Sequence, residues 1–203
     1  DGGDGMGVIS LTKALADSRN QAFVRIGYDM GFDNIYHTFY EYQLYDDNVK
    51  LLPSSMLGAV ETTPMNVAIA YSRAINGGYD ITAQFVQRIK DKAGNILEQS
   101  PTQIDKIDVN QVDVSDKIKT MLHSVVANGT AYEAFKGLNL DNIGGKTGTS
   151  NEVIDSWFAG YKGPYVIVVH VGYDTPKSLG NHEFGATIAG PIAEEIIKGM
   201  ASF

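Results

Sequence analysis

Three consecutive strand-like runs near the C-terminal end constrain the fold of this 203-residue chain most strongly. They span residues 142–148, 154–161 and 165–171, and only short turns separate them. Strands joined by such turns pair antiparallel, because a parallel connection needs a dozen or more residues. Helix-like patterns dominate the residues before these runs, and one more follows them. We therefore expect an α+β fold, a mostly antiparallel sheet with helices packed on it.

Helical periodicity and capping residues place the flanking helices. The clearest pattern begins with Thr63 as N-cap and Pro64 in the first turn, and it ends at Gly77-Gly78. The same criteria predict helices over residues 10–18, 20–31, 115–129 and 190–200. The aromatic-rich residues 33–46 are expected to form a short helix and then a loop.

Two other segments have less regular patterns. Residues 82–100 alternate like two strands joined by a turn at Gly94-Asn95, and residues 100–114 form a polar connection.

In the last predicted helix, residues 190–200, we expect Ile192, Ile196 and Ile197 to face inward.

The composition limits what the chain can bind. Its formal net charge is −8, whereas nucleic-acid binding needs clustered positive charge, so we expect no nucleic-acid partner. The chain has no cysteine, and its histidines lack metal-ligand spacing, so the sequence predicts no metal and no cofactor. We expect all four histidines to be structural or exposed: His37, His123, His170 and His182.

The segment GGKTGTS, residues 144–150, carries the most specific chemistry, and two interpretations of it compete. A phosphate-binding loop has the pattern G-x-x-x-x-G-K-[ST] between a strand and a helix. Gly145, Lys146 and Thr147 meet its last three positions, but its first glycine would fall on Leu140. The residues after the segment alternate like a strand, which also disfavours a nucleotide site.

The alternative is a strand that binds a peptide-like substrate along its edge. Lys146 supplies positive charge, and the hydroxyls of Thr147 and Thr149 can bind carboxylate oxygens. Gly148 has no side chain, so a substrate can approach the backbone, where a free N–H can polarise a carbonyl oxygen. This interpretation predicts acyl transfer.

A second element fits the same chemistry. The triplet Ser18-Arg19-Asn20 lies between two predicted helices. A serine hydroxyl there can pass protons, and an asparagine amide can hold a substrate backbone. Alone the triplet is weak evidence, because capping serines and loop asparagines are common.

Four stretches together resemble the C-terminal part of the transpeptidase domain of class A (bifunctional) penicillin-binding proteins. They occur in that family's order and cover most of residues 5–175. They read GVISLTKALADSRNQAFVRIGYDMG, LPSSMLGAVETTPMNVAIAYSRAINGG, VVANGTAYEAF and GGKTGTSNEVIDSWFAGYKG. The resemblance implies that residues 1–203 are one domain, the C-terminal portion of such a transpeptidase domain. The parent would be an extracytoplasmic, membrane-anchored enzyme that cross-links peptidoglycan stem peptides ending in D-Ala-D-Ala and binds β-lactams.

The resemblance also implies residue roles. Ser18 would relay protons, Asn20 would orient the substrate, and Lys146 would support Ser18 electrostatically. The backbone N–H of Thr149 would form half of an oxyanion hole. Substrate binding would fall to Thr147, Gly148 and Thr149.

The nucleophile of that family is the serine of an S-x-x-K motif, and this chain has one such motif, Ser10 to Lys13. It lies only eight residues before Ser18, whereas the family's serine lies several tens of residues upstream, so we expect Ser10 to cap a helix. The nucleophile would then precede Asp1 in a longer parent, as would a glycosyltransferase domain and the anchor. Two other functions stay open: a D,D-carboxypeptidase or β-lactamase, and an inactive relative that senses β-lactams or acts as a scaffold.

The remaining aromatic residues are expected to be structural. Trp157 and Phe158 should pack in the core on the strand that follows the predicted site, and Asp155 is a candidate polar anchor. The aromatic cluster over residues 36–46 should pack inside the protein rather than line a groove.

Overall fold

The computed structural model describes residues 7–45, 52–100, 111–180 and 184–200. Its helices are α1 (Leu11–Ala16), α2 (Asn20–Met30), α3 (Phe32–Glu41), α4 (Pro64–Ile75), α5 (Gln111–Asn128), α6 (Tyr132–Phe135) and α7 (Ala189–Met200). Two 3₁₀ turns are also described: η1 (Pro53–Leu57) lies between α3 and α4, and η2 (Asn151–Val153) lies between β3 (Ile143–Thr149) and β4 (Ser156–Lys162). The strands are β1 (Arg88–Lys90), β2 (Ile96–Gln99), β3 (Ile143–Thr149), β4 (Ser156–Lys162) and β5 (Tyr165–Val171).

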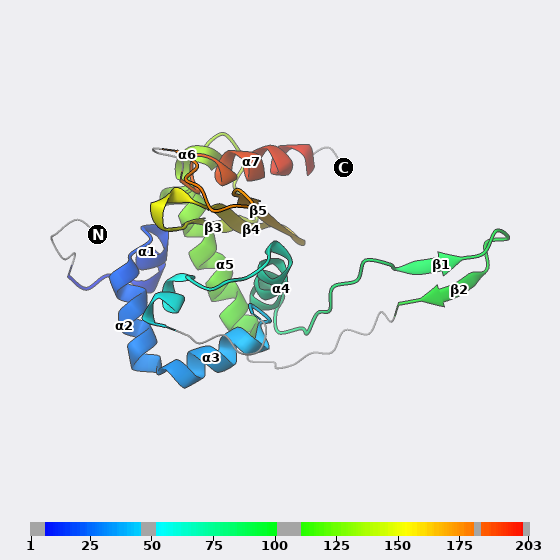
Figure 1. Cartoon of the computed structure of the whole chain (residues 1–203), viewed down its shortest axis with the longest axis horizontal. Helices are drawn as coiled ribbons and strands as arrows, with labels where there is room; N and C mark the ends of the chain where they lie inside the picture. The colour runs from blue at the N-terminus through cyan, green and yellow to red at the C-terminus, as the bar shows by residue number, and fades with distance from the viewer. Residues whose placement is uncertain (1–6, 46–51, 101–110, 181–183, 201–203) are drawn as a thin grey trace.

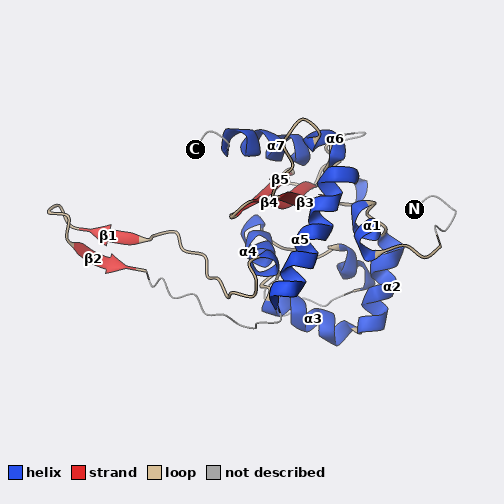
Figure 2. Cartoon of the chain, turned by 180° about the vertical axis from the view of Figure 1, so that it is seen from behind, coloured by secondary structure: helices blue, strands red, loops and turns tan. Residues whose placement is uncertain are grey.

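The strands β3, β4 and β5 form one antiparallel sheet in chain order. Helices α6 and α7 lie on one side of this sheet, and α4 and α5 lie on the other (Figure 1). Figure 2 shows α5 passing beside the sheet, with α1 next to it. The predicted α+β fold, an antiparallel sheet covered by helices, is confirmed.

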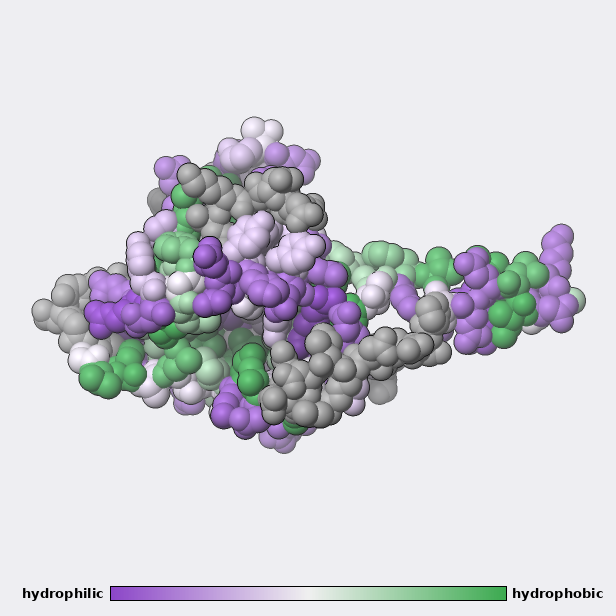
Figure 3. Space-filling model, turned by 90° about the horizontal axis from the view of Figure 1, so that it is seen from below, coloured by the Kyte–Doolittle hydropathy of each residue, from purple (hydrophilic) through white to green (hydrophobic). Residues whose placement is uncertain are grey.

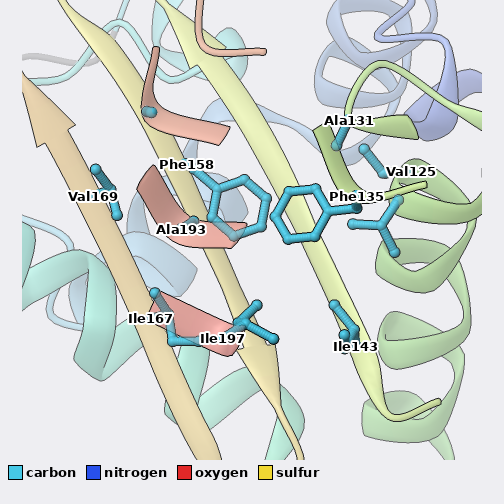
Figure 4. Close-up of a cluster of buried hydrophobic side chains, with 11 residues drawn as sticks. Val125, Ala131, Phe135, Ile143, Phe158, Ile167, Val169, Ala193 and Ile197 are labelled. Carbon is cyan, nitrogen blue, oxygen red and sulfur yellow. The ribbon is translucent and has the colours of Figure 1, made fainter. Parts of the chain in front are cut away.

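The larger hydrophobic cluster fills the space between the sheet and α6 and α7. Phe158 of β4 and Phe135 of α6 are fully buried, and their rings stack with centroids 5.0 Å apart (Figure 4). The other buried members are Val125, Val126, Ala131, Ile143, Ile167, Val169, Ala189, Ala193 and Ile197. Their burial holds the end of α5 and the first residue of β3 against α7.

A smaller cluster covers the opposite face of the sheet. Tyr161 of β4 packs there with Ile75 of α4 and Leu122 of α5. The Tyr161 hydroxyl donates a hydrogen bond of 3.1 Å to the backbone oxygen of Lys119. Because side chains alternate along a strand, one strand supplies Phe158 to one cluster and Tyr161 to the other.

The predicted boundaries of α4 are confirmed. The Thr63 hydroxyl accepts a hydrogen bond of 3.1 Å from the backbone N–H of Asn66 and so caps the helix. After the helix, Gly77 and Gly78 have φ angles of 84° and 90°, which glycine adopts at little cost.

Two predictions about helices are wrong. Residues 111–114 belong to α5 and not to a polar connection, and Val112 and Val114 there are exposed, so the first turn carries no inward apolar signal. In α7, Ile192 and Ile196 are each 43% exposed, and only Ile197 of the three predicted residues is buried. The buried face of α7 is instead lined by alanines, whose small side chains let the helix lie close to the sheet.

The aromatic cluster is only partly internal. Tyr45 is buried and contacts the rings of Tyr36 and Phe39. Tyr36 and Tyr40 are exposed, so the prediction that this group packs inside is right for Tyr45 and wrong for these two. The helix α3 turns these two residues outward while its buried position is Ile35.

The predicted hairpin over residues 82–100 is confirmed as strands β1 and β2. It projects away from the body, and Figure 3 shows hydrophobic side chains along this arm. Asp91 closes its turn by accepting hydrogen bonds of 2.8 Å from the backbone N–H groups of Ala93 and Asn95.

Among the residues that the structure describes, no helix combines the length and apolar character needed to cross a membrane.

The complete burial of Phe158 predicts that Phe158→Ala will destabilise the chain strongly. Loss of a fully buried phenylalanine removes its burial energy and leaves a cavity, so the free energy of unfolding should fall by about 3–5 kcal/mol. The matched control is Phe85→Ala on the hairpin arm, where the side chain is 84% exposed and the expected change is below about 0.5 kcal/mol. Urea unfolding measures both, and equal effects would contradict this assignment of the core.

Candidate active site

The strand β3 carries residues 143–149 along one edge of the three-stranded sheet. One side of β3 pairs with β4, and within the described residues no strand pairs with the other side. Gly144 and Gly145 fit closely against β4, since a Cβ atom at either would lie 2.6 Å or less from the ring of Tyr161 or Phe158. A substrate strand could therefore pair with β3 only along the edge that faces away from β4.

Lys146 and Thr147 lie on opposite faces of the sheet, because neighbours in a strand alternate. Lys146 is half-buried, and its Nζ donates a hydrogen bond of 2.9 Å to the backbone oxygen of Thr147. Burial disfavours the charged ammonium and lowers the pKa of Lys146 from its ordinary value of 10.5 to about 8. A nearby anion would favour the charged form and raise this pKa.

The two threonine hydroxyls of β3 are held by neighbouring segments. Thr147 Oγ1 lies 2.9 Å from Thr130 Oγ1, and either atom can be the donor. Thr149 Oγ1 accepts a hydrogen bond of 3.0 Å from the backbone N–H of Gly185. Gly185 sits so close to the sheet that a Cβ atom there would lie 2.5 Å from the backbone oxygen of Gly148.

The triplet that starts at Ser18 forms the turn between α1 and α2. The backbone N–H of Arg19 bonds to Ala14 O at 2.8 Å, and that of Ser18 bonds to Leu15 O at 3.1 Å, as in a Schellman motif. Ser18 has φ 53°, a left-handed conformation that favours glycine. Asn20 opens α2 and is exposed.

The structure brings this turn near β3 through the end of α5. The backbone N–H of Thr130 donates a hydrogen bond of 3.0 Å to Ala16 O, two residues before Ser18, while its hydroxyl contacts Thr147. Thr130 is therefore hydrogen-bonded both to the end of α1 and to β3. Among the described residues, the side chains of Ser18, Asn20 and Lys146 share no hydrogen bond with one another.

Sequence reasoning missed Thr130 and Gly185 as parts of this site. Thr130 lies within the stretch VVANGTAYEAF, directly after the glycine that ends α5. A threonine next to a helix-stopping glycine is ordinary in a loop, so only the folded position of α5 reveals its contact with β3.

The local S-x-x-K motif has a structural role, as predicted. Ser10 Oγ accepts a hydrogen bond of 3.2 Å from the backbone N–H of Lys13 and caps α1. The Nζ of Lys13 lies 2.8 Å from Asp17 Oδ2, and this hydrogen bond lowers the pKa of Asp17. Both groups of the motif are thus engaged within α1 and its C-cap.

The predicted core position is right for Phe158 and wrong for Trp157. Trp157 projects from the opposite face of β4, is half-buried, and stacks on the His170 ring with centroids 4.2 Å apart. His170 Nε2 lies 2.8 Å from Asp155 Oδ1, so Asp155 is a polar anchor, as expected. Strand alternation explains why adjacent aromatic residues cannot both enter one core.

The other histidines also match a structural or exposed role where they are described. His123 Nδ1 lies 2.8 Å from Ile143 O and ties α5 to β3, and His37 is exposed on α3. His182 lies outside the described residues. In the described part of the chain, no three His, Cys, Asp or Glu side chains are grouped to hold a metal ion.

The buried lysine predicts a measurable titration. Between about pH 8 and pH 10.5, the unfolded chain binds a proton at Lys146 that the folded chain has lost, so stability should rise with pH across this window. NMR of lysine side chains labelled with ¹³C should show one signal titrating near pH 8, and Lys146→Arg should remove it. If every lysine signal titrated near 10.5, the assigned burial of Lys146 would be wrong.

The strained turn predicts a stabilising substitution at Ser18. Ser18→Gly relieves the left-handed strain and should raise the free energy of unfolding by about 0.5–1 kcal/mol. Ser18→Ala keeps a Cβ atom and should give no gain, so it serves as the matched control. Thermal unfolding of the three proteins measures this, and a glycine variant less stable than the alanine variant contradicts the strain.

Comparison with known proteins identifies the family. The family described as Penicillin binding protein transpeptidase domain matches residues 1–198. Penicillin-binding protein 1A of Neisseria flavescens is 34% identical over 197 residues, which cover 94% of this chain and 24% of that protein. Penicillin-binding protein 1A of Rickettsia bellii is 32% identical over 208 residues, covering 92% of this chain and 26% of that protein. The chain therefore spans about a quarter of the length of these curated relatives.

Solved structures share the fold. Penicillin-binding protein 1A from Haemophilus influenzae superposes with a TM-score of 0.83 at 23% identity, over 95% of this chain and 34% of that one. The PonA1 protein from Mycobacterium tuberculosis in complex with penicillin V gives a TM-score of 0.80 at 19% identity, over 98% of this chain and 58% of that one. The resemblance seen in the sequence is confirmed, and the chain belongs to the penicillin-binding protein transpeptidase domain family.

Proposed function

We propose that this chain is the C-terminal portion of the transpeptidase domain of a class A penicillin-binding protein. The parent is a serine acyltransferase that cross-links peptidoglycan through peptides ending in D-Ala-D-Ala. The observation that carries this proposal is the unpaired edge of β3, which carries Lys146, Thr147 and Thr149 around Gly148. The lysine is half-buried, and each threonine hydroxyl is hydrogen-bonded to a neighbouring segment.

The charges and donors of β3 suit a peptide with a free C-terminal carboxylate. The ammonium of Lys146 attracts the carboxylate, and the Thr147 and Thr149 hydroxyls can each donate to one of its oxygens. Thr149 Oγ1 accepts the N–H of Gly185, which leaves its own proton for the substrate. The backbone N–H of Thr149 polarises the carbonyl that is attacked, as half of an oxyanion hole.

The reaction has two acyl-transfer steps. A serine oxygen attacks the carbonyl carbon of the penultimate D-alanine, the C–N bond to the terminal D-alanine breaks, and the proton of the serine hydroxyl passes to the leaving amine. An amine of a neighbouring strand then attacks the ester, forms the new amide as the ester C–O bond breaks, and gives up one of its own protons to the serine oxygen. Ser18 relays protons in these steps, and Asn20 holds the substrate backbone.

The nucleophilic serine is supplied from outside the 203 residues. Ser10 is unsuited to the role because its hydroxyl caps α1 and the ammonium of Lys13 is bound to Asp17. The proposal therefore places the S-x-x-K serine in an upstream part of the same protein, with the glycosyltransferase domain and a membrane anchor. The partners are stem peptides and β-lactams on the outer side of the cytoplasmic membrane.

Intact-mass measurement after incubation with a penicillin tests this function. The protein extended to include an upstream S-x-x-K serine should gain the mass of one penicillin, and the 203-residue chain should gain none. In the extended protein, Lys146→Ala should slow adduct formation by about 100-fold, because a positioned charge and proton-transfer group is lost. Lys90→Ala on the hairpin arm is the control and should leave the rate unchanged.

Four results would contradict the proposal. An adduct on the 203-residue chain would make Ser10 or another of its serines reactive. An extended protein that forms no adduct would be an inactive relative. Rapid release of hydrolysed penicillin would instead indicate a β-lactamase, and release of D-alanine without cross-linking to an added amine would indicate a carboxypeptidase.

A further inference from the structure

Thr130 occupies the junction of three segments. Its backbone N–H donates to Ala16 O at the end of α1, and its hydroxyl lies 2.9 Å from Thr147 Oγ1 of β3. The preceding residue, Gly129, has no room for a side chain, because a Cβ atom there would lie 2.4 Å from Ala16 O. The close approach of α1 to α5 therefore fixes where the Thr130 side chain stands.

The direction of the Thr130–Thr147 hydrogen bond decides what Thr147 can do. Each hydroxyl has one proton to donate. If Thr147 donates to Thr130, it has no proton left for a substrate. If Thr130 donates to Thr147, the Thr147 proton is free, and a bound carboxylate would favour this arrangement because it accepts that proton. Hydrogen bonds arranged in such a chain also polarise and strengthen one another.

We propose that Thr130 is a positioning residue that donates to Thr147 and so aims the Thr147 hydroxyl at the substrate carboxylate. The inference rests on the proposed function and adds a residue to the carboxylate-recognition site. Its consequence is selective: loss of the Thr130 hydroxyl should weaken recognition of a carboxylate but not recognition of the carbonyl under attack. Thr130 acts through Thr147 and touches no reacting atom.

Thr130→Val separates this role from a structural one. Valine keeps the side-chain shape and the backbone N–H that bonds to Ala16 O, and it removes only the hydroxyl. Thr130→Ser restores a donor at the same position. Thr120→Val, on the exposed face of α5, is the control for replacing a threonine hydroxyl elsewhere.

The experiment measures acylation rates of the extended protein with a penicillin as free acid and as its methyl ester. Thr130→Val should slow acylation by the free acid about 3- to 10-fold, the worth of one hydrogen bond, and change the ester rate less than about 2-fold. Thr130→Ser and Thr120→Val should stay within about 2-fold of wild type for both probes. In a Thr147→Val background, the effect of Thr130→Val should disappear, because the two residues act as one unit.

Results that differ from these expected rates would overturn the inference. Equal slowing of both probes, or loss of folding in Thr130→Val, would make Thr130 a structural residue, and unchanged rates would remove any role. An effect that persists at full size in the Thr147→Val background would show that it does not pass through Thr147. A wild-type extended protein that forms no adduct would instead overturn the proposed function itself, so the two failures are distinguishable.

Discussion

The burial of both faces of a three-stranded sheet is the constraint on which the rest of this structure depends. Phe158 and its neighbours pack against α6 and α7, while Tyr161 packs against α4 and α5. A strand between two cores must send alternate side chains in opposite directions. That rule directs Lys146 of the edge strand β3 to one face of the sheet and Thr147 to the other.

The contact of α1, α5 and β3 connects this strand to the turn at Ser18. Gly129 allows the ends of the two helices to meet, and Thr130 then reaches both Ala16 and Thr147. The turn itself is strained, because Ser18 occupies a left-handed conformation. Strain of this kind persists only where the surroundings hold it, and here hydrogen bonds to α1 and the contact of α1 with the end of α5 do so. The stability of the fold and the geometry of the proposed site therefore share the same contacts.

Local patterns in the sequence predicted much of this architecture. Capping at Thr63, the hairpin turn at Gly94 and the three paired strands follow from local chemistry, which acts over a few residues. The inward face of α7 was mispredicted because large isoleucines dominate a hydrophobicity pattern, whereas alanines permit the close packing that the fold uses. The contact of Thr130 with Thr147 joins residues from different segments, and no local rule specifies it. The candidate site strand could be predicted because its lysine, threonines and glycines are contiguous in the sequence.

A crystal structure of the extended protein with a covalently bound penicillin would test the central claim most directly. The account predicts that the carboxylate of the bound drug lies about 3 Å from the hydroxyls of Thr147 and Thr149, with the Lys146 ammonium beside it. Thr130 should remain hydrogen-bonded to Thr147 in that complex. A carboxylate placed away from β3, with these residues turned from the drug, would contradict it.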